Sequence, residues 1–227
     1  MLVNADFSLR AAVVPQQYQW VASPQPGVER VMLDRLGAET GRATSIVRYA
    51  SGSSFPQHRH SGGEEILVLG GTFSEGSDHY PAGWYLRNPP GSSHRPFSDE
   101  GATLFVKLCQ MRADETQQVR IDTRDASRWI VRDGRQSCPL FAGRGEQVSI
   151  ERLAPSAGVF SRRVEGAEML VLEGSLHEGA MRYDPGSWIR LPAGQYPAFI
   201  AGSAGAAVYL RIGAHPEGGA AEQGARC

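Results

Sequence analysis

The stretch that decides the fold of this 227-residue chain is Phe55-Pro56-Gln57-His58-Arg59-His60-Ser61-Gly62-Gly63-Glu64-Glu65-Ile66-Leu67-Val68-Leu69-Gly70-Gly71. Side chains alternate faces along an extended segment, so His58 and His60 project to the same side. Gly62 and Gly63 permit a bend or bulge before Glu64 opens an apolar run. This pattern predicts one strand that delivers two imidazoles to a single point, followed by a buried strand that starts with a carboxylate.

A second stretch answers the first: Gly83-Trp84-Tyr85-Leu86-Arg87-Asn88-Pro89-Pro90-Gly91-Ser92-Ser93-His94. Its Pro-Pro-Gly turn is a rigid way to aim His94 from a distant strand back at the same point. Together the two stretches offer His58, His60, Glu64 and His94. Three neutral imidazoles and one carboxylate suit one borderline divalent ion such as zinc, iron, manganese or nickel.

The two stretches resemble the two motifs of the cupin superfamily, and their sequences are similar to that of the cupin domain of the ChrR-type anti-sigma factors. The resemblance implies an all-β double-stranded β-helix, an RmlC-like jelly-roll barrel with a metal in its mouth. The composition agrees, because 27 glycines and 14 prolines fall between short apolar runs. Candidate strands are Val31–Leu36, Ala43–Tyr49, Glu65–Leu69, Gly83–Asn88 and Thr103–Leu108.

The second half of the sequence repeats the first. The run that begins at Glu65 aligns with the run that begins at Glu168, an offset of 168 − 65 = 103, and the same offset sets Pro89-Pro90-Gly91 on Pro192-Ala193-Gly194. The chain is therefore predicted to be a bicupin, two tandem barrels. Its expected domains are a first barrel over 1–112, with an N-terminal arm over 1–25, a second barrel over 113–213 and a flexible tail over 214–227.

The repeat also tests the ligands. At the offset of 103, all four are replaced together, by Ser161, Arg163, Ala167 and Pro197. Residues that serve the fold should survive in both copies, whereas residues that serve a metal should be lost as a set. The second barrel is therefore expected to bind no metal, and to be either a copy kept for stability or an anion site built on Arg162 or Arg163.

The same comparison assigns the neighbours of the ligands. Glu65 and Arg87 persist as Glu168 and Arg190, so we interpret them as structural, with Arg87 in an ion pair or at the rim. Aromatic residues near the motifs are mostly expected to pack, but Tyr85 and Phe105 are candidates for lining the pocket. No catalytic residue is assigned, because no separate general base or nucleophile stands beside the ligands.

Composition limits the partners and the compartment. The net charge of −1 and the lack of a basic cluster argue against nucleic acid, and no apolar run is long enough to cross a bilayer. Three widely spaced cysteines fit reduced thiols, and the N-terminus does not read as a signal peptide, so a cytoplasmic location is expected. The sequence allows a homodimer but does not indicate one.

Two functions from different classes remain open at this stage. The family resemblance implies a zinc-bearing sensing or regulatory module, active in an oxidative stress response, that binds a small ligand or reactive oxygen species. Residues 1–40 contain no His and no Cys, so the family's zinc-dependent sigma-factor binding is not carried over. The alternative is a ferrous iron-dependent dioxygenase that acts on a diketone or a hydroxylated aryl ketone, and the sequence does not decide whether the chain is an enzyme.

Overall fold

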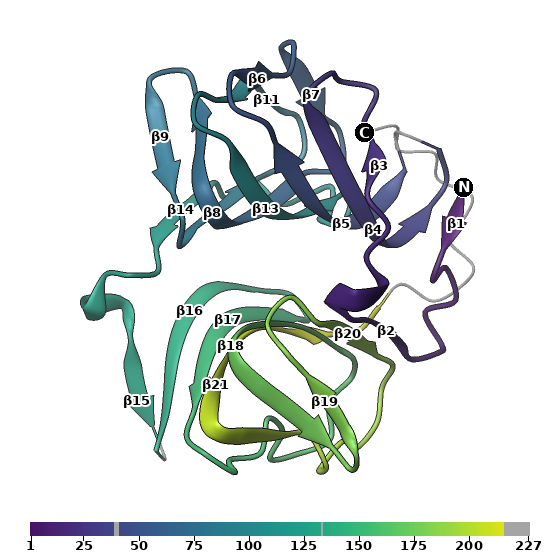
Figure 1. Ribbon diagram of the computed structural model, residues 1–227, viewed down its shortest axis with the longest axis vertical. Helices are drawn as coiled ribbons and strands as arrows, with labels where there is room; N and C mark the ends of the chain where they lie inside the picture. Colours follow the sequence, from purple (N-terminus) through teal and green to yellow (C-terminus); the bar gives the residue numbers. More distant parts are fainter. Residues whose placement is uncertain (39–40, 133, 216–227) are drawn as a thin grey trace. The chain divides into compact units, whose positions relative to one another are not determined.

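The computed structural model describes residues 1–38, 41–132 and 134–215, and statements about the structure refer to these. Nearly all regular structure is antiparallel β, as predicted, with two 3-10 turns, η1 (Pro15–Gln17) and η2 (Ala126–Arg128). The strands, labelled in Figure 1, are β1 (Leu2–Val3), β2 (Ala11–Val13), β3 (Val21–Ala22), β4 (Val28–Leu36), β5 (Arg42–Tyr49), β6 (Ser53–Ser54), β7 (His58–His60), β8 (Glu64–Glu75), β9 (Asp78–Pro81), β10 (Trp84–Asn88), β11 (Ser92–His94), β12 (Pro96–Ser98), β13 (Ala102–Leu108), β14 (Val119–Asp122), β15 (Ile130–Arg132), β16 (Arg135–Gly143), β17 (Glu146–Leu153), β18 (Ala167–Glu178), β19 (Met181–Tyr183), β20 (Trp188–Leu191) and β21 (Ile200–Gly213).

The chain folds into two compact units. The first contains residues 1–5 and 19–124, and the second contains residues 6–18 and the described residues from Asp125 onward. The main sheet of the first unit runs in the order β1-β4-β5-β13-β8-β10-β14, and that of the second runs β15-β16-β17-β21-β18-β20-β2. Each sheet curls around its own apolar core, which gives the jelly-roll barrel expected from the sequence (Figure 1).

Strand pairing reproduces the predicted repeat. In the first unit Glu64 faces Asn88 across β8 and β10, and in the second Ala167 faces Leu191 across β18 and β20. Both residues of the second pair lie 103 positions beyond those of the first (167 − 64 and 191 − 88). The alignment made from sequence is therefore the alignment of the two strand ladders.

A pair of glycines marks the same close approach in each barrel. Gly71 has φ +65°, and a Cβ there would lie 2.0 Å from the carbonyl oxygen of Gly101. Gly174 has φ +69°, and a Cβ there would lie 2.2 Å from the carbonyl oxygen of Gly205. Only glycine tolerates both the left-handed backbone and the missing space, which explains why the Gly of each apolar run is repeated.

The middle of the N-terminal arm, residues 6–18, does not belong to the barrel that follows it. Strand β2 pairs with β20 of the second unit, whereas β14, which precedes the second barrel, pairs with β10 of the first. The two arms are thus exchanged. The division also differs from the predicted domains 1–112 and 113–213, because the first unit extends to Arg124 through β14. The edges of β10 and β20 are equivalent in the two repeats, and either could pair with β2 or with β14. Local sequence does not determine which of the two pairings forms.

The residues retained in both repeats have structural roles, as interpreted from the sequence. Arg87 Nη1 donates to Glu65 Oε2 at 2.9 Å, and the Arg87 side chain is 1% exposed. In the second unit Glu168 accepts a 2.8 Å hydrogen bond from Trp188 Nε1, and the Arg190 guanidinium lies 3.9 Å from the centre of the Phe7 ring. The glutamates and arginines therefore brace the sheets in both copies.

The ends and the cysteines add two points. The predicted flexible tail lies outside the described residues except for Ala214 and His215, and His215 Nε2 lies 3.1 Å from the carbonyl oxygen of Leu191. Cys138 is a buried free thiol whose burial raises its pKa to about 11. Cys109 is disulfide-bonded, which differs from the expectation of reduced cysteines.

Candidate metal centre

The three predicted histidines meet on a small two-stranded sheet. Strands β7 and β11 pair antiparallel with His58 opposite His94, so the turn at Pro89–Gly91 brings His94 back to the first stretch as expected. Gly91 in that turn has φ +88°, a conformation that side chains rarely adopt. The three imidazole rings lie 4.7–4.9 Å apart between centroids, each steeply inclined to the others.

The donor atoms converge on one point. One ring nitrogen from each of His58, His60 and His94 lies within 4.8 Å of the other two, and His60 Nε2 is 2.9 Å from His94 Nε2. Oε2 of Glu64, the first residue of β8, lies 3.4 Å from both of these Nε2 atoms. Donors bound at about 2.0–2.2 Å to one ion stand roughly 3.0–3.5 Å apart, so these residues fit a metal. The histidine cluster is shown, and Glu64 as the fourth ligand remains a prediction.

Hydrogen bonds on the far side of the rings leave the Nε2 atoms available. His58 Nδ1 lies 2.9 Å from the carbonyl oxygen of Pro56 and His94 Nδ1 lies 2.6 Å from Glu75 Oε2. A carbonyl and a carboxylate only accept, so each Nδ1 carries the proton and each Nε2 keeps a lone pair for a metal. The ligand geometry is therefore fixed from outside the centre.

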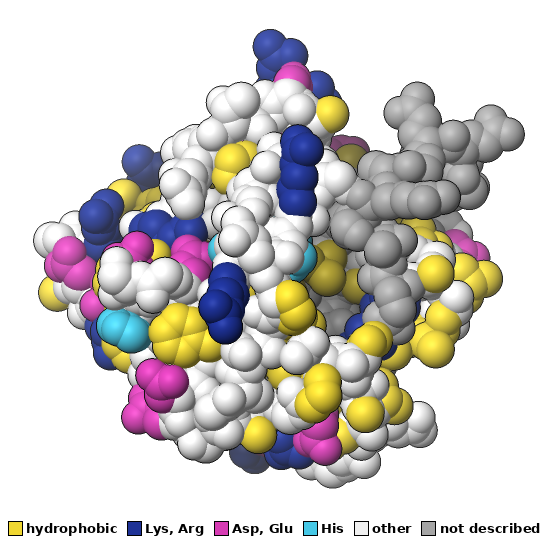
Figure 2. All heavy atoms as spheres, turned by 90° about the horizontal axis from the view of Figure 1, so that it is seen from above, with side chains coloured by type: hydrophobic (Ala, Val, Ile, Leu, Met, Phe, Trp, Pro, Cys, Tyr) yellow, Lys and Arg dark blue, Asp and Glu magenta, His cyan; other side chains and the backbone are white. Residues whose placement is uncertain are grey.

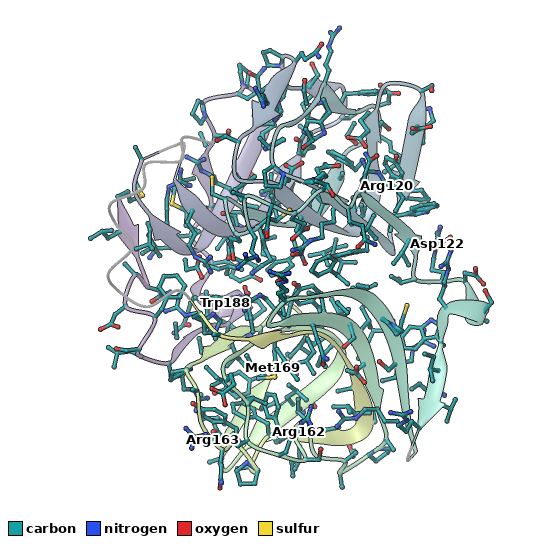
Figure 3. All side chains as sticks on the ribbon, turned by 180° about the vertical axis from the view of Figure 1, so that it is seen from behind. Arg120, Asp122, Arg162, Arg163, Met169 and Trp188 are labelled. Carbon is teal, nitrogen blue, oxygen red and sulfur yellow. The ribbon has the colours of Figure 1, made fainter. Side chains whose placement is uncertain are left out.

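The fourth donor is held in the same way. Asn88 Nδ2 donates to Glu64 Oε2 at 3.1 Å, and Asn88 Oδ1 in turn accepts from Arg120 Nη2 at 2.7 Å. The same Nη2 donates to Glu75 Oε1 at 2.5 Å. Figure 3 labels Arg120 on the first unit's sheet, beside Asp122 of the same strand. Sequence analysis missed Asn88, Glu75 and Arg120.

One of these three could have been found from the sequence. Asn88 is replaced by Leu191 at the offset of 103, so it is lost in the second repeat together with the ligands. Glu75 is retained as Glu178 and would have been taken as structural by the same test. Arg120 lies outside both motifs and carries no local signal.

Burial and charge shift the histidines in opposite directions. Burial lowers the pKa of His60, with the carboxylate of Glu64 opposing it. Burial also acts against protonation of His94, but the hydrogen bond to Glu75 and the charges of Glu64 and Glu75 outweigh it and raise its pKa. Burial raises the pKa of Glu75, but its hydrogen bonds with His94 and Arg120 and their charges lower it by more. The net pKa is therefore lowered, and Glu75 stays a carboxylate.

The two pocket-lining candidates point away from this centre. Tyr85 alternates with Leu86, and Phe105 with Leu104 and Val106, and the leucines and the valine belong to the apolar core of the first barrel. Alternation therefore puts both aromatic side chains on the opposite face of the sheet, where they are 0% and 1% exposed. That they line the cavity stays a prediction, which this alternation does not support. The aromatic rings beside the cluster are those of Phe55, 5.8 Å from the ring of His58, and Phe73, 6.2 Å from the ring of His94. Burial, together with the charge of Glu64, raises the pKa of Tyr49.

The second barrel is filled where the first holds its ligands. Ala167 and Leu191 replace Glu64 and Asn88, and both are fully buried in a core that includes Met169 and Phe199. Arg162 and Arg163 are exposed on a loop at one end of that barrel (Figure 3). Among the residues that the structure describes, the three histidines of the first barrel form the one cluster suited to a metal.

Two observations concern nucleic acid and membranes as partners. On the face shown in Figure 2, Lys and Arg side chains lie singly among polar and apolar surface, without forming a broad basic patch. In the part of the chain that the structure covers, no helix combines the length and the apolar character needed to span a bilayer.

Comparisons with known proteins agree with the fold. Residues 8–112 match the family model described as the ChrR cupin-like domain. No curated protein matches the sequence significantly. Many solved structures are similar in fold, and three are described here. A "putative dioxygenase" from Nostoc punctiforme has 14% identity and a TM-score of 0.74 over 91% of this chain and 83% of that one.

The other two structures come from Escherichia coli. The bacterial pirin YhhW in complex with nickel(II) has 13% identity and a TM-score of 0.64, over 92% of this chain and 100% of that one. The protein Ylba has 18% identity and a TM-score of 0.66, over 91% of this chain and 92% of that one. At such identities these likenesses show the fold alone.

Barrel, motifs and histidine cluster together define a metal-binding cupin. More narrowly, residues 8–112, a little under half of the chain, match the family model of the ChrR cupin-like domain.

Proposed function

We propose that the chain is a sensing or regulatory module that holds one divalent ion, zinc first, on His58, His60, His94 and Glu64, and that a small-molecule ligand acts on this centre. The observation that carries the proposal is the histidine cluster: one ring nitrogen from each of His58, His60 and His94 lies within 4.8 Å of the other two, and Glu64 Oε2 lies 3.4 Å from the Nε2 atoms of His60 and His94. Four protein ligands fill a tetrahedral zinc shell, which is the arrangement of a closed centre.

The surroundings favour binding over chemistry. The core beside the ligands is apolar, with Ile66, Phe73 and Leu86 among its members. Among the groups that hold the ligands only Glu75 could act as a base, and it is hydrogen-bonded to His94 and Arg120, so it is not placed as a separate general base. No thiolate belongs to the ligand set, so small-ligand binding is a simpler mode of sensing than oxidation of the centre by reactive oxygen species. Sigma-factor binding is not part of the proposal.

The second candidate is a ferrous iron-dependent dioxygenase for a diketone or a hydroxylated aryl ketone. The description of the Nostoc punctiforme neighbour as a dioxygenase favours it, although that likeness shows the fold alone. In an octahedral ion the same four ligands would leave two positions for substrate and oxygen. The identity of the metal separates the two candidates.

The test is elemental analysis of the full chain purified without chelators, with two variants beside it. His60→Ala removes a buried donor, and His79→Ala removes an exposed histidine outside the cluster. About one equivalent of zinc per chain, lost in His60→Ala and kept in His79→Ala, is expected. Iron at that stoichiometry, with oxygen uptake on adding diketones, would favour the dioxygenase. Absence of any metal, even after reconstitution of the wild type, would overturn both.

A further inference from the structure

Arg120 contacts both of the side chains, Glu75 and Asn88, that hydrogen-bond to predicted metal donors. Its guanidinium donates to Glu75 Oε1 at 2.5 Å, to Asn88 Oδ1 at 2.7 Å and to the hydroxyl of Tyr80 at 3.1 Å. Glu75 holds His94 Nδ1 at 2.6 Å, and Asn88 holds Glu64 Oε2 at 3.1 Å. One intermediate side chain therefore separates Arg120 from each of two metal donors, His94 on β11 and Glu64 on β8.

The second barrel shows which of these contacts belong to the fold. There Arg10 donates to both carboxylate oxygens of Glu178, at 2.9 and 2.5 Å, and to the hydroxyl of Tyr183 at 2.6 Å. Glu178 and Tyr183 are Glu75 and Tyr80 shifted by 103 (178 − 75 and 183 − 80). An Arg–Glu–Tyr brace is thus present in both barrels, and in each it is supplied by an exchanged arm.

The first barrel adds two links to this brace. Asn88 stands where the second barrel has Leu191, and His94 stands where it has Pro197. The bonds from Arg120 to Asn88 and from Glu75 to His94 therefore exist only in the barrel that has the histidine cluster. The absence of both links from the copy without the histidine cluster connects them to the metal site rather than to the barrel.

We propose that Arg120 is a positioning residue of the metal centre, which orients His94 through Glu75 and Glu64 through Asn88. The inference rests on the metal site of the proposed function. Arg120 lies on β14, beyond the residues 8–112 that match the family model, so the first barrel depends on the following arm for a complete centre. A planar guanidinium reaches Glu75, Asn88 and Tyr80 at once, whereas an ammonium group is a compact donor and reproduces the set only in part.

The test measures zinc affinity of the full chain by competition with a chelating indicator, for Arg120→Met and for the matched variant Arg10→Met. Both variants break an Arg–Glu–Tyr brace, but only Arg120→Met touches the network of the ligands. Arg120→Met is expected to weaken zinc binding about 10- to 100-fold, the usual effect of removing a group behind the ligands. Arg10→Met is expected to stay within about twofold of the wild type.

Two further measurements keep the outcomes distinct. The visible spectrum of the cobalt(II)-substituted protein should change in Arg120→Met and not in Arg10→Met, and Arg120→Lys should bind zinc with an intermediate affinity. If Arg120→Met does not fold by circular dichroism, Arg120→Lys decides. Equal weakening by the two Met variants, or affinity within twofold of the wild type for Arg120→Met, overturns the inference alone. A wild type that binds no zinc overturns the proposed function and the inference with it.

Discussion

Asn88 and Glu64 face each other across β10 and β8, and the amide of Asn88 donates to Glu64 Oε2 at 3.1 Å. At the corresponding place in the second barrel, Leu191 faces Ala167, both 0% exposed. The polar pair Glu64–Asn88 and the apolar pair Ala167–Leu191 thus occupy equivalent buried positions in the two barrels. A buried carboxylate needs a partner when no metal holds it, and an alanine does not.

Asn88→Leu should therefore harm both the metal site and the fold. It leaves the buried Glu64 carboxylate without its amide donor, so we expect zinc affinity to fall about tenfold or more and unfolding free energy of the metal-free protein to fall by about 1–3 kcal/mol. Chelator competition and urea unfolding measure the two effects. The double variant Glu64→Ala/Asn88→Leu reproduces the second barrel, and it should regain stability without regaining metal. A double variant no more stable than Asn88→Leu would contradict this interpretation.

The adjacent glutamates should behave oppositely. Glu64→Gln removes a charged donor and is expected to lower zinc affinity strongly with little effect on folding. Glu65→Ala should keep the metal but lower stability by about 3 kcal/mol, because Arg87 is 1% exposed and loses a buried partner, although Glu115 remains. Metal content and denaturant unfolding of both variants decide. Loss of metal in Glu65→Ala with a stable fold would reverse the assignment.

The sequence predicted most of the fold because both motifs and the internal repeat are local patterns. His58, His60 and His94 could be placed together from the spacing of two strands and one turn, and the structure brings them within 4.8 Å. Glu65 could be set aside because Glu168 repeats it.

What the sequence did not predict depends on which face a strand presents and which edge an arm pairs with. Tyr85 and Phe105 lie near the motifs in sequence, yet alternation turns them away from the core that contains the ligands. Arg120 reaches the centre only because β14 pairs with β10, a choice between two equivalent edges that depends on tertiary packing.

The exchange of arms makes its own prediction. Deleting residues 1–14 removes β2, the bond from Arg190 to the Asp6 carbonyl oxygen and the ion pair of Arg10 with Glu178 from the second unit, and it removes β1, which pairs with the edge of β4, from the first. Amide hydrogen exchange should then quicken in β20 by about tenfold or more, since each 1.4 kcal/mol of lost local stability is a factor of ten. Exchange in β8 and β10 and zinc affinity should be unchanged. Faster exchange in β8 and β10, with β20 unchanged, would instead favour the predicted domain over 1–112.

Proton competition at the centre should depend on Glu75. Ligand imidazoles must be neutral to bind a metal, so zinc affinity should fall as pH falls, by about tenfold per unit for each ligand that is protonated. The pKa of His94 is raised, with Glu75 and Glu64 outweighing burial, so proton competition begins at a higher pH than an ordinary histidine would give.

Glu75→Gln removes the charge that favours the protonated ring. The affinity measured at pH 8 should be lower in this variant because His94 is less well oriented, but the fall on acidification should begin at a lower pH. Titration of zinc affinity from pH 8 to 5 in wild type, Glu75→Gln and the matched second-barrel variant Glu178→Gln checks both effects. Glu178→Gln should follow the wild-type curve, because Glu178 pairs with Arg10 and contacts no ligand of the cluster. Coincident curves for all three proteins would show that Glu75 has no influence on the protonation of His94.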